Sequence, residues 1–160
     1  MSLDPTRPKT SCEIERKFLV KELPSNLEKY ECRRIEQGYL AVERNGTQVR
    51  LRRAGTVCSL TVKHGGGVTR HEWEIELTEL QFQELWPATQ GRRLRKTRYD
   101  VPFETFTIEV DIYDGSHAGL VVAEVEFADE DQCHRFQPPD WLGQDVSGKP
   151  RYSNIKLARE

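Results

Sequence analysis

The sequence predicts a mainly β fold of the α+β class, with eight antiparallel strands closed into a barrel around a charged lumen and a few flanking helices. Eight segments alternate polar and apolar residues with the period of two that is typical of strands. Few segments show a helical period, and closure of the sheet would remove its exposed strand edges. Basic and acidic residues lie largely on different strands, which indicates a lumen for a charged ligand.

The first five strands are expected in the N-terminal half. Their predicted ranges are residues 12–20, 35–43, 47–53, 57–63 and 68–77. Asn45-Gly46 predicts a type I′ hairpin turn. The run of glycines at 65–67 predicts a second hairpin turn, and a short helix is expected over residues 24–31.

The longest helix is expected directly after the fifth strand. Thr78 followed by Gln81 is a capping-box pattern, so the helix begins there and runs to Gln90, with a bend at Pro87 and an end at Gly91. Three more strands and two short helices follow. The strands are predicted over residues 93–101, 106–113 and 120–127, and the helices over residues 129–136 and 152–158.

Length and composition exclude several classes of protein. The 160 residues fit one domain over residues 12–160, preceded by a flexible tail at residues 1–11. With 24 Lys and Arg against 26 Asp and Glu, the net charge of −2 argues against a nucleic-acid polymer as partner. No apolar run approaches the roughly 18 residues of a membrane helix, so no membrane contact is expected.

The cysteines indicate the compartment. Cys12, Cys32, Cys58 and Cys133 are far apart and form no CxxC pair, so we expect free thiols in a cytoplasmic protein. The chain is expected to be a monomer or a homodimer.

The segment at residues 13–17 carries the strongest chemical signal. Glu13, Glu15 and Lys17 have the spacing of two that places them on one face of a strand, while Ile14 and Phe18 lie on the other face. Taken alone, this pattern is most simply a solvated outer face above a core. It acquires another meaning because the other strands also carry one charged face each.

Two interpretations of the charged faces are open. One is an outer surface with cross-strand ion pairs. The other is an inward-facing lumen, because like charges two residues apart, about 7 Å, repel by about 2 kcal/mol at an effective dielectric of about 20 unless a ligand neutralises them. A polyphosphate needs guanidinium and ammonium donors, and Mg²⁺ or Mn²⁺ needs carboxylate oxygens. An inward charged face would leave the apolar face outside, to be covered by the helices near residues 24–31, 78–90 and 152–158.

The motifs resemble those of a known family. The segment Glu13-Ile14-Glu15-Arg16-Lys17 resembles the ExExK signature of the CYTH superfamily, the triphosphate tunnel metalloenzymes. Further similar segments follow in the same order, namely residues 37–40, 49–52, 60–63, 70–76, 96–99, 109–111, 123–127, 141–143 and 151–154. The short chain is similar to the compact bacterial branch, which includes inorganic tripolyphosphatases.

The resemblance implies roles for particular residues. It implies metal ligands at Glu13, Glu15, Asp111, Glu124 and Glu126, with Mg²⁺ or Mn²⁺ as the cofactor. It implies phosphate-binding bases at Lys17, Arg50, Arg52, Lys63, Lys96 and Arg98. A supporting acidic wall would contain Glu72, Glu74, Glu76 and Glu109. The catalytic residues would be Lys17, Tyr39 and Glu15, with Tyr39 either paired with Lys17 to activate water or a packing aromatic.

The activity implied is hydrolysis of a small-molecule triphosphate, most simply tripolyphosphate to pyrophosphate and phosphate, with side activity on nucleoside or thiamine triphosphates. An adenylyl cyclase is an alternative, although no residues mark a purine pocket. A polyphosphate- or nucleotide-binding module without catalysis is another. Arg151 either reaches the mouth of the lumen or is a cation flanking the last helix.

Overall fold

The computed structural model describes residues 9–11, 13–64 and 70–159, and these residues form one antiparallel sheet with few helices. The strands are β1 (Lys9–Ser11), β2 (Ile14–Val20), β3 (Cys32–Val42), β4 (Gln48–Ala54), β5 (Val57–His64), β6 (Arg70–Leu77), β7 (Arg93–Phe103), β8 (Phe106–Tyr113), β9 (Val121–Phe127) and β10 (Leu142–Asp145). Their order in the sheet is β1-β6-β5-β4-β3-β7-β8-β9-β2-β10. The mainly β prediction is therefore confirmed.

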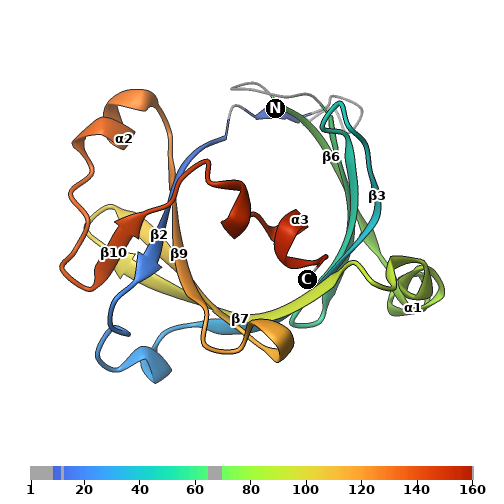
Figure 1. Ribbon diagram of the computed structural model, residues 1–160, viewed down its shortest axis with the longest axis horizontal. Helices are drawn as coiled ribbons and strands as arrows, with labels where there is room; N and C mark the ends of the chain where they lie inside the picture. The colour runs from blue at the N-terminus through green and yellow to red at the C-terminus, as the bar shows by residue number, and fades with distance from the viewer. Residues whose placement is uncertain (1–8, 12, 65–69, 160) are drawn as a thin grey trace, which may run out of the picture.

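The sheet curls around a central region, as Figure 1 shows. All eight predicted strands are present, and the described residues add β1 and β10, so their sheet has ten strands. The predicted closed eight-stranded barrel is not confirmed, because no ladder among the described strands joins β6 to β2. The free edge of β2 is paired with β10, and the edge of β6 that faces away from β5 is paired with β1. The strand β1 lies within the segment predicted to be a flexible tail.

The helices of the described residues are short. They are α1 (Glu79–Leu85), α2 (Glu130–Arg135) and α3 (Asn154–Leu157), with 3₁₀ turns η1 (Leu27–Lys29), η2 (Trp86–Thr89), η3 (Gly115–His117) and η4 (Pro150–Tyr152). The predicted capping box of Thr78 and Gln81 is present. The α-helix ends at Leu85 and a 3₁₀ turn containing Pro87 follows, because proline cannot donate the backbone hydrogen bond that would extend an α-helix. None of these helices is long and apolar enough to cross a membrane.

The predicted hairpin at Asn45-Gly46 is confirmed, but its turn type is wrong. A type I′ turn needs a positive φ at both central residues, and here only Gly46 has one, at 91°. The Gly46 amide donates to the Glu43 carbonyl at 3.1 Å, and the side chain of Asn45 accepts from the Thr47 amide at 2.9 Å. Asn45 therefore acts through its side chain. The glycine turn predicted at 65–67 lies outside the described residues.

The outer face of the sheet is apolar and covered in two places. Beside β2, β8 and β9, a cluster that includes Phe18, Ile108 and Val125 packs with Phe136, which directly follows α2, and with Leu27 of η1. Beside β4 and β5, Leu51 packs with residues of α1 and its flanks. The cover predicted from the helices near residues 24–31 and 78–90 is confirmed.

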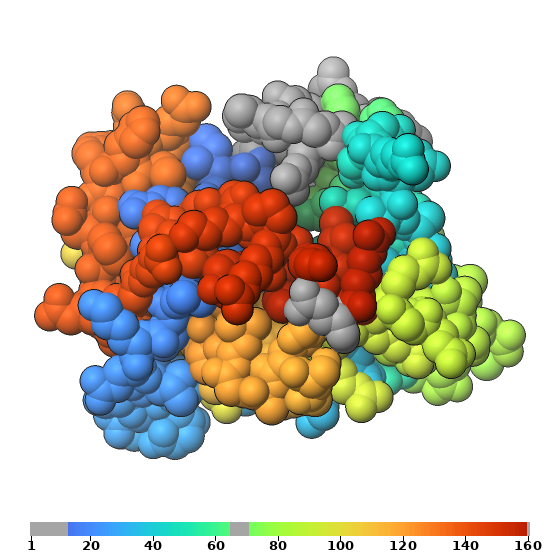
Figure 2. Space-filling model, in the orientation of Figure 1, coloured from blue at the N-terminus to red at the C-terminus, as the bar shows by residue number. Residues whose placement is uncertain are grey.

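The last predicted helix does not cover the outside. Figure 1 shows α3 inside the ring of strands, and in Figure 2 the C-terminal segment covers the centre of the ring on the side that faces the viewer. Leu157 and Ala158 pack with Tyr39, Tyr113 and neighbouring apolar residues of the inner face. The prediction that this helix lies outside is therefore wrong, because one part of the inner face is apolar and needs an apolar partner.

Candidate active site

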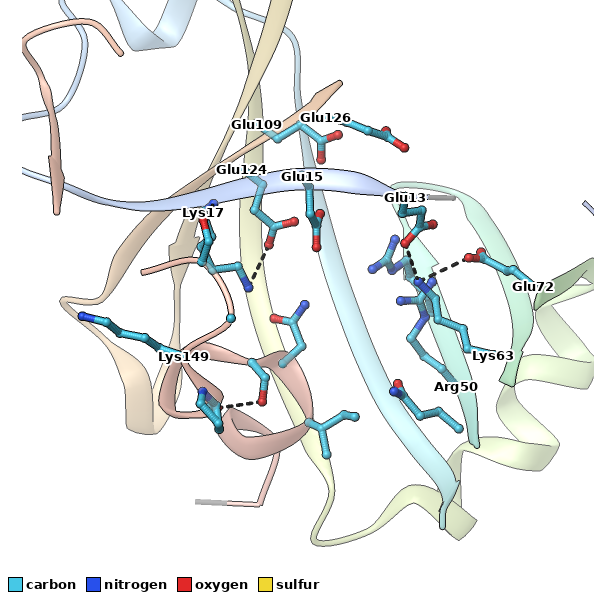
Figure 3. Close-up of a pocket in the computed structure, with 18 of the residues that line it drawn as sticks. Glu13, Glu15, Lys17, Arg50, Lys63, Glu72, Glu109, Glu124, Glu126 and Lys149 are labelled. Atoms are coloured by element: carbon cyan, nitrogen blue, oxygen red, sulfur yellow. Dashed lines mark hydrogen bonds and ion pairs between the residues drawn. The ribbon is translucent and has the colours of Figure 1, made fainter. Parts of the chain in front are cut away.

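A cavity of about 520 Å³ lies within the curled sheet and is lined mostly by polar side chains (Figure 3). Its residues from the strands and their flanks are Glu13, Glu15, Lys17, Tyr39, Gln48, Arg50, Arg52, Lys63, Glu72, Glu74, Arg98, Glu109, Glu124 and Glu126. The C-terminal segment adds residues 146–150 and 153–155. The predicted inward orientation of the charged faces is therefore what the structure shows for these residues.

The sheet order separates the charges into arcs. Most bases come from the neighbouring strands β4 and β5 and from β7, whereas acids come from β8, β9 and β2 and from β6 on the other side. Lys17 of β2 is a base within the acidic arc. Between the two basic groups, β3 contributes Tyr39, which pairs in register with Arg50. A lumen with adjoining basic and acidic walls results, because side chains at spacing two share a face of each strand.

Glu15 and Glu124 are interacting like charges of the acidic wall. Lys17 pairs in register with Glu124, and Glu15 with Glu126 on the same two strands. Glu15 is exposed to solvent at the cavity, but partial desolvation, followed by the charge of Glu124, raises its pKa to about 7. Glu124 itself stays charged, because Lys17 above all outweighs the effect of burial and lowers its pKa. One of these carboxylates is thus poised to share a proton or a cation at neutral pH.

Lys17 lies at the junction of the sheet with the C-terminal segment. Its ammonium group is 3.2 Å from Glu124 Oε1 and donates to the Tyr152 carbonyl at 3.0 Å. Its backbone amide donates to Ser147 Oγ at 2.9 Å, and its carbonyl accepts from the Val146 amide at 2.8 Å. The C-terminal segment and Glu124 therefore fix both the backbone and the ammonium group of Lys17.

Lys63 links two acids across the cavity. Its ammonium group is 3.5 Å from Glu13 Oε2 and 3.3 Å from Glu72 Oε2, as the dashed lines in Figure 3 show. Since Glu13 belongs to β2 and its flank while Glu72 belongs to β6, this lysine bridges two strands that do not pair with each other. An anionic ligand could exchange for either carboxylate.

Two arginines of β4 are held close together with their charges incompletely neutralised. The Nε of Arg50 is buried with no hydrogen-bond partner, and Nη2 has only a 3.5 Å contact with Thr61 Oγ1. Burial, then the nearby Arg50 and Arg98, lowers the pKa of Arg52 to about 10. Buried cations of like sign are costly unless an anion binds between them.

Gln37 positions this basic group. It is completely buried, its amide nitrogen donates to Tyr39 Oη at 2.9 Å, and its carbonyl oxygen accepts from Arg52 Nε at 2.8 Å. Burial raises the pKa of Tyr39, so the phenol is neutral at pH 7. Gln37 was not among the predicted site residues. Its spacing of two from Tyr39 would have placed it on the same inner face.

A second charged group of β7 and β8 lies beneath the cavity surface. Lys96 and Asp111 have fully buried side chains, 2.6 Å apart, and Arg98 binds both oxygens of Asp111 at 2.7 and 2.8 Å. Burial alone would raise the pKa of Asp111, but Lys96 and Arg98 hold it well below its usual range. Arg98 also pairs with Glu109 and reaches the cavity.

Most of the predicted residues are brought together, and three are not. Lys96, Asp111 and Glu76 are absent from the cavity lining. Lys17 and Tyr39 line the same cavity, but each has other partners, namely Tyr152 and Glu124 for Lys17 and Gln37 for Tyr39. Arg151 lines a second, smaller cavity of about 240 Å³.

The C-terminal contribution was not predicted. The cavity is also lined by Ser147, Lys149, Ser153 and Asn154, and by Gln48 from β4. No strand period runs through residues 146–155, so periodicity carried no signal for their inward placement, and the motif at residues 151–154 marked the segment but not its position.

The donor set suits a hard cation only together with a ligand. Among the described residues, no three His, Cys, Asp or Glu side chains converge into a ready metal site. The carboxylates Glu13, Glu15, Glu124 and Glu126 nevertheless line one cavity, and the charges of Glu124 and Glu13 add to desolvation in raising the pKa of Glu15. Because Mg²⁺ is usually bound by one or two carboxylates together with phosphate oxygens, these residues fit such a cation.

A curled antiparallel sheet around a cavity with cationic and carboxylate walls is suited to a class of proteins that bind a polyanion together with a divalent cation. The model of the CYTH domain matches residues 11–157, so the chain belongs to the CYTH family.

The similar proteins extend over nearly the whole chain. An inorganic triphosphatase of Nitrosomonas europaea is 42% identical over 147 residues, which are 91% of this chain and 96% of that protein. One of Acetivibrio thermocellus is 37% identical over 150 residues, 92% and 93% of the two chains. A crystal structure of an inorganic triphosphatase has a TM-score of 0.74 at 38% identity and covers 94% of this chain and 96% of its own.

A more distant structure shares the fold alone. A conserved hypothetical protein of Pyrococcus furiosus has a TM-score of 0.56 at 16% identity, with 82% of this chain and 94% of that chain covered.

Proposed function

We propose that the protein hydrolyses inorganic tripolyphosphate to pyrophosphate and phosphate with the help of a divalent cation, Mg²⁺ or Mn²⁺. The observation that carries the proposal is the single cavity in which the under-neutralised Arg50 and Arg52 adjoin the acidic pair Glu15 and Glu124. The names of the two relatives that are 42% and 37% identical support the same substrate.

The bases would bind and align the phosphates. Arg50, Arg52 and Lys63 are in reach of one extended chain of phosphates, and Arg98 is held toward the cavity by Asp111. Lys17 lies among the acids, beside Glu124, and would neutralise charge on the bond that breaks. Asp111, predicted with the metal ligands, is assigned here to positioning Arg98 and Lys96, since both its oxygens are already bonded.

The acids would hold the cation. Glu13, Glu15, Glu124 and Glu126 are the proposed ligands, with Glu72, Glu74 and Glu109 as further negative charges of the wall. When bound, the cation polarises phosphate oxygens and the attacking water. Tyr39, neutral at pH 7 and on the same cavity as Lys17, would orient that water through its hydroxyl group.

The proposal includes a closed tunnel. The strands β1 and β2 are separated along the chain only by residues 12 and 13, yet they pair with β6 and β9 on the two sides of the ring. The chain itself, and not a hydrogen-bonded ladder, would then join the two sides of the tunnel. Oligomeric state and location in the cell stay predictions.

The test is a substrate panel with product identification. Tripolyphosphate, ATP, thiamine triphosphate and pyrophosphate are each incubated with Mg²⁺, Mn²⁺ or a chelator, and the products are separated by ion-exchange chromatography. We expect cation-dependent turnover with tripolyphosphate as the best substrate. Formation of cyclic AMP from ATP would instead indicate a cyclase, and tight binding of tripolyphosphate without turnover would indicate a binding module.

A further inference from the structure

The C-terminal segment of residues 146–158, called the end wall below, separates two cavities. Its residues Ser153, Asn154 and Ile155 line the large cavity that holds the candidate active site. Its residues Tyr152 and Leu157 line the second cavity, of about 240 Å³, which shares none of the lining residues of the first. In Figure 2 the same segment covers the centre of the ring.

Polar contacts fix the end wall to three different elements. The Tyr152 carbonyl accepts from Lys17 of β2 at 3.0 Å. The side chain of Asn154 accepts from the Tyr113 hydroxyl of β8 at 2.7 Å. The Leu157 carbonyl is 2.6 Å from Nε2 of His117 in η3, which must donate. Attachment at three separate points holds the segment in one position.

Apolar packing adds to these contacts. The side chains of Leu157 and Ala158 are buried against Tyr39, Leu94, Tyr113 and Val122 on the inner face of the sheet. Opening the end wall would expose this cluster to water. A segment so attached is a fixed part of the site and not a lid.

We propose that the end wall is a stop for linear polyphosphates and thereby sets which phosphoanhydride bond is cleaved. The inference rests on the proposed function. A chain that enters the large cavity advances until its terminal phosphate reaches Ser153 and Asn154, while the bases of β4 and β5 hold the phosphates that follow. The bond presented to Lys17 and the acids then lies at a fixed number of phosphates from the end, whatever the length of the chain.

The chemistry of the step is ordinary hydrolysis. The oxygen of water forms a bond to one phosphorus, the bridging P–O bond breaks, and the bridging oxygen leaves with the bonding electron pair on the other fragment. The two protons of water are distributed between the two phosphate products and the solvent. No oxidant or reductant is needed.

Tetrapolyphosphate provides the test, because its two kinds of bond give different products. Cleavage of an outer bond gives phosphate and tripolyphosphate, and cleavage of the central bond gives two pyrophosphates. Initial products are followed by ³¹P NMR with the metal-loaded protein. For the wild type we expect one cleavage mode to exceed the other by about tenfold or more, the discrimination that a well-packed site provides.

The variant Tyr113→Phe/Leu157→Ala weakens the end wall without changing a residue that lines the large cavity. We expect it to hydrolyse tripolyphosphate and to give a mixture of both cleavage modes, with the preference reduced about threefold or more. The control is Leu80→Ala, which shortens the same type of side chain at a position that is 68% exposed on α1. This control is expected to keep the wild-type products.

A chain that ends at Pro150 is the second variant. It removes most of the end wall. It is used if hydrogen exchange of residues 151–158 is the same in the double variant as in the wild type, because the double substitution has then not loosened the end wall. The same mixture of cleavage modes is expected. Its fold is checked by circular dichroism, and if it does not fold, Leu157→Asp, which places a charge in the apolar cluster, takes its place.

The outcomes separate the two proposals. A wild type that does not hydrolyse tripolyphosphate overturns the proposed function. A wild type that cleaves tripolyphosphate but gives both modes from tetrapolyphosphate overturns only the stop, as does a folded variant with a loosened end wall that keeps one mode. A wild type that hydrolyses tripolyphosphate but not tetrapolyphosphate also overturns the stop, because the stop presents the same bond whatever the length of the chain.

Discussion

Two charged regions of this sheet are built from similar residues and differ in how their charges are neutralised. In the first, called the buried network, Lys96 and Arg98 of β7 surround Asp111 of β8. In the second, called the acidic corner, Glu15 and Lys17 of β2 face Glu124 of β9. In the buried network, both oxygens of the Asp111 carboxylate are paired with cations of the protein. In the acidic corner, two carboxylates share one cation, Lys17.

The difference shows up in the pKa of the acids. Lys96 and Arg98 hold the pKa of Asp111 well below its usual range despite burial, whereas burial and Glu124 raise that of Glu15 to about 7. A fully paired charge serves the structure of the protein, while an excess negative charge is relieved by a proton or by a ligand of the opposite sign. The comparison predicts that substitutions in the two regions have opposite consequences.

The largest expected effect is a loss of stability in the buried network. Asp111→Asn removes the charge that Lys96 and Arg98 share and leaves the buried Lys96 without its ion-pair partner and Arg98 with Glu109 alone, and breaking a buried ion pair typically costs about 3 to 5 kcal/mol. The free energy of unfolding, measured by urea denaturation, should fall by this amount. A variant as stable as the wild type would contradict the role given to the buried network.

The next effect is a loss of activity at the acidic corner. Glu15→Gln removes a proposed cation ligand and should lower kcat for tripolyphosphate about 10² to 10³-fold, which corresponds to about 3 to 4 kcal/mol. The midpoint of thermal unfolding should not fall, because the substitution relieves repulsion with Glu124. The matched control is Glu28→Gln on the exposed turn η1, which should change neither quantity. Retained activity in Glu15→Gln would remove this residue from the site.

Tyr39 tests whether the cavity uses a neutral hydroxyl group. Tyr39→Phe keeps the ring in its apolar cluster and removes the oxygen that accepts from Gln37. If the hydroxyl orients water, kcat should fall about 10- to 100-fold with little change in KM. A change smaller than about threefold would identify Tyr39 as a packing residue, the alternative that its sequence position also allows.

The sequence predicted the parts of this molecule that depend on local period. The eight long strands and the capping box at Thr78 follow from local patterns, as does the shared face of Glu13, Glu15 and Lys17, whereas the inward direction of that face was one of two open interpretations. Sequence reasoning did not predict β10, a strand of four residues with an irregular register, or the inward position of α3. Their placement depends on contacts with distant strands, such as the bond between Tyr113 and Asn154, which no local pattern encodes.

The candidate site divides in the same way. Parity could identify the charged residues, but it could not distinguish those that reach the cavity from those that neutralise one another below it. Arg98 and Lys96 have the same parity on β7, and only Arg98 reaches the cavity. The distinction depends on depth within the curled sheet, which is set by the tertiary structure.

The smallest expected effect is the pH dependence of stability in the protein freed of divalent cations. The folded-state pKa of Glu15 is raised from 4.5 to about 7, so between these pH values the folded state binds more protons than the unfolded state. Stability is then highest at the acid end of this window and falls as the pH rises toward 7, by on the order of 1 kcal/mol, because solvent screens part of the interaction. Glu15→Gln should flatten this part of the curve, whereas the Asp111 carboxylate, whose pKa is lowered, contributes stability that is lost only at more acidic pH. Urea denaturation at several pH values with a chelator measures the slope. Excess Mg²⁺ should reduce the slope, since a cation bound to Glu15 displaces its proton. A wild-type slope that equals the slope of Glu15→Gln would show that the acidic corner carries no excess charge.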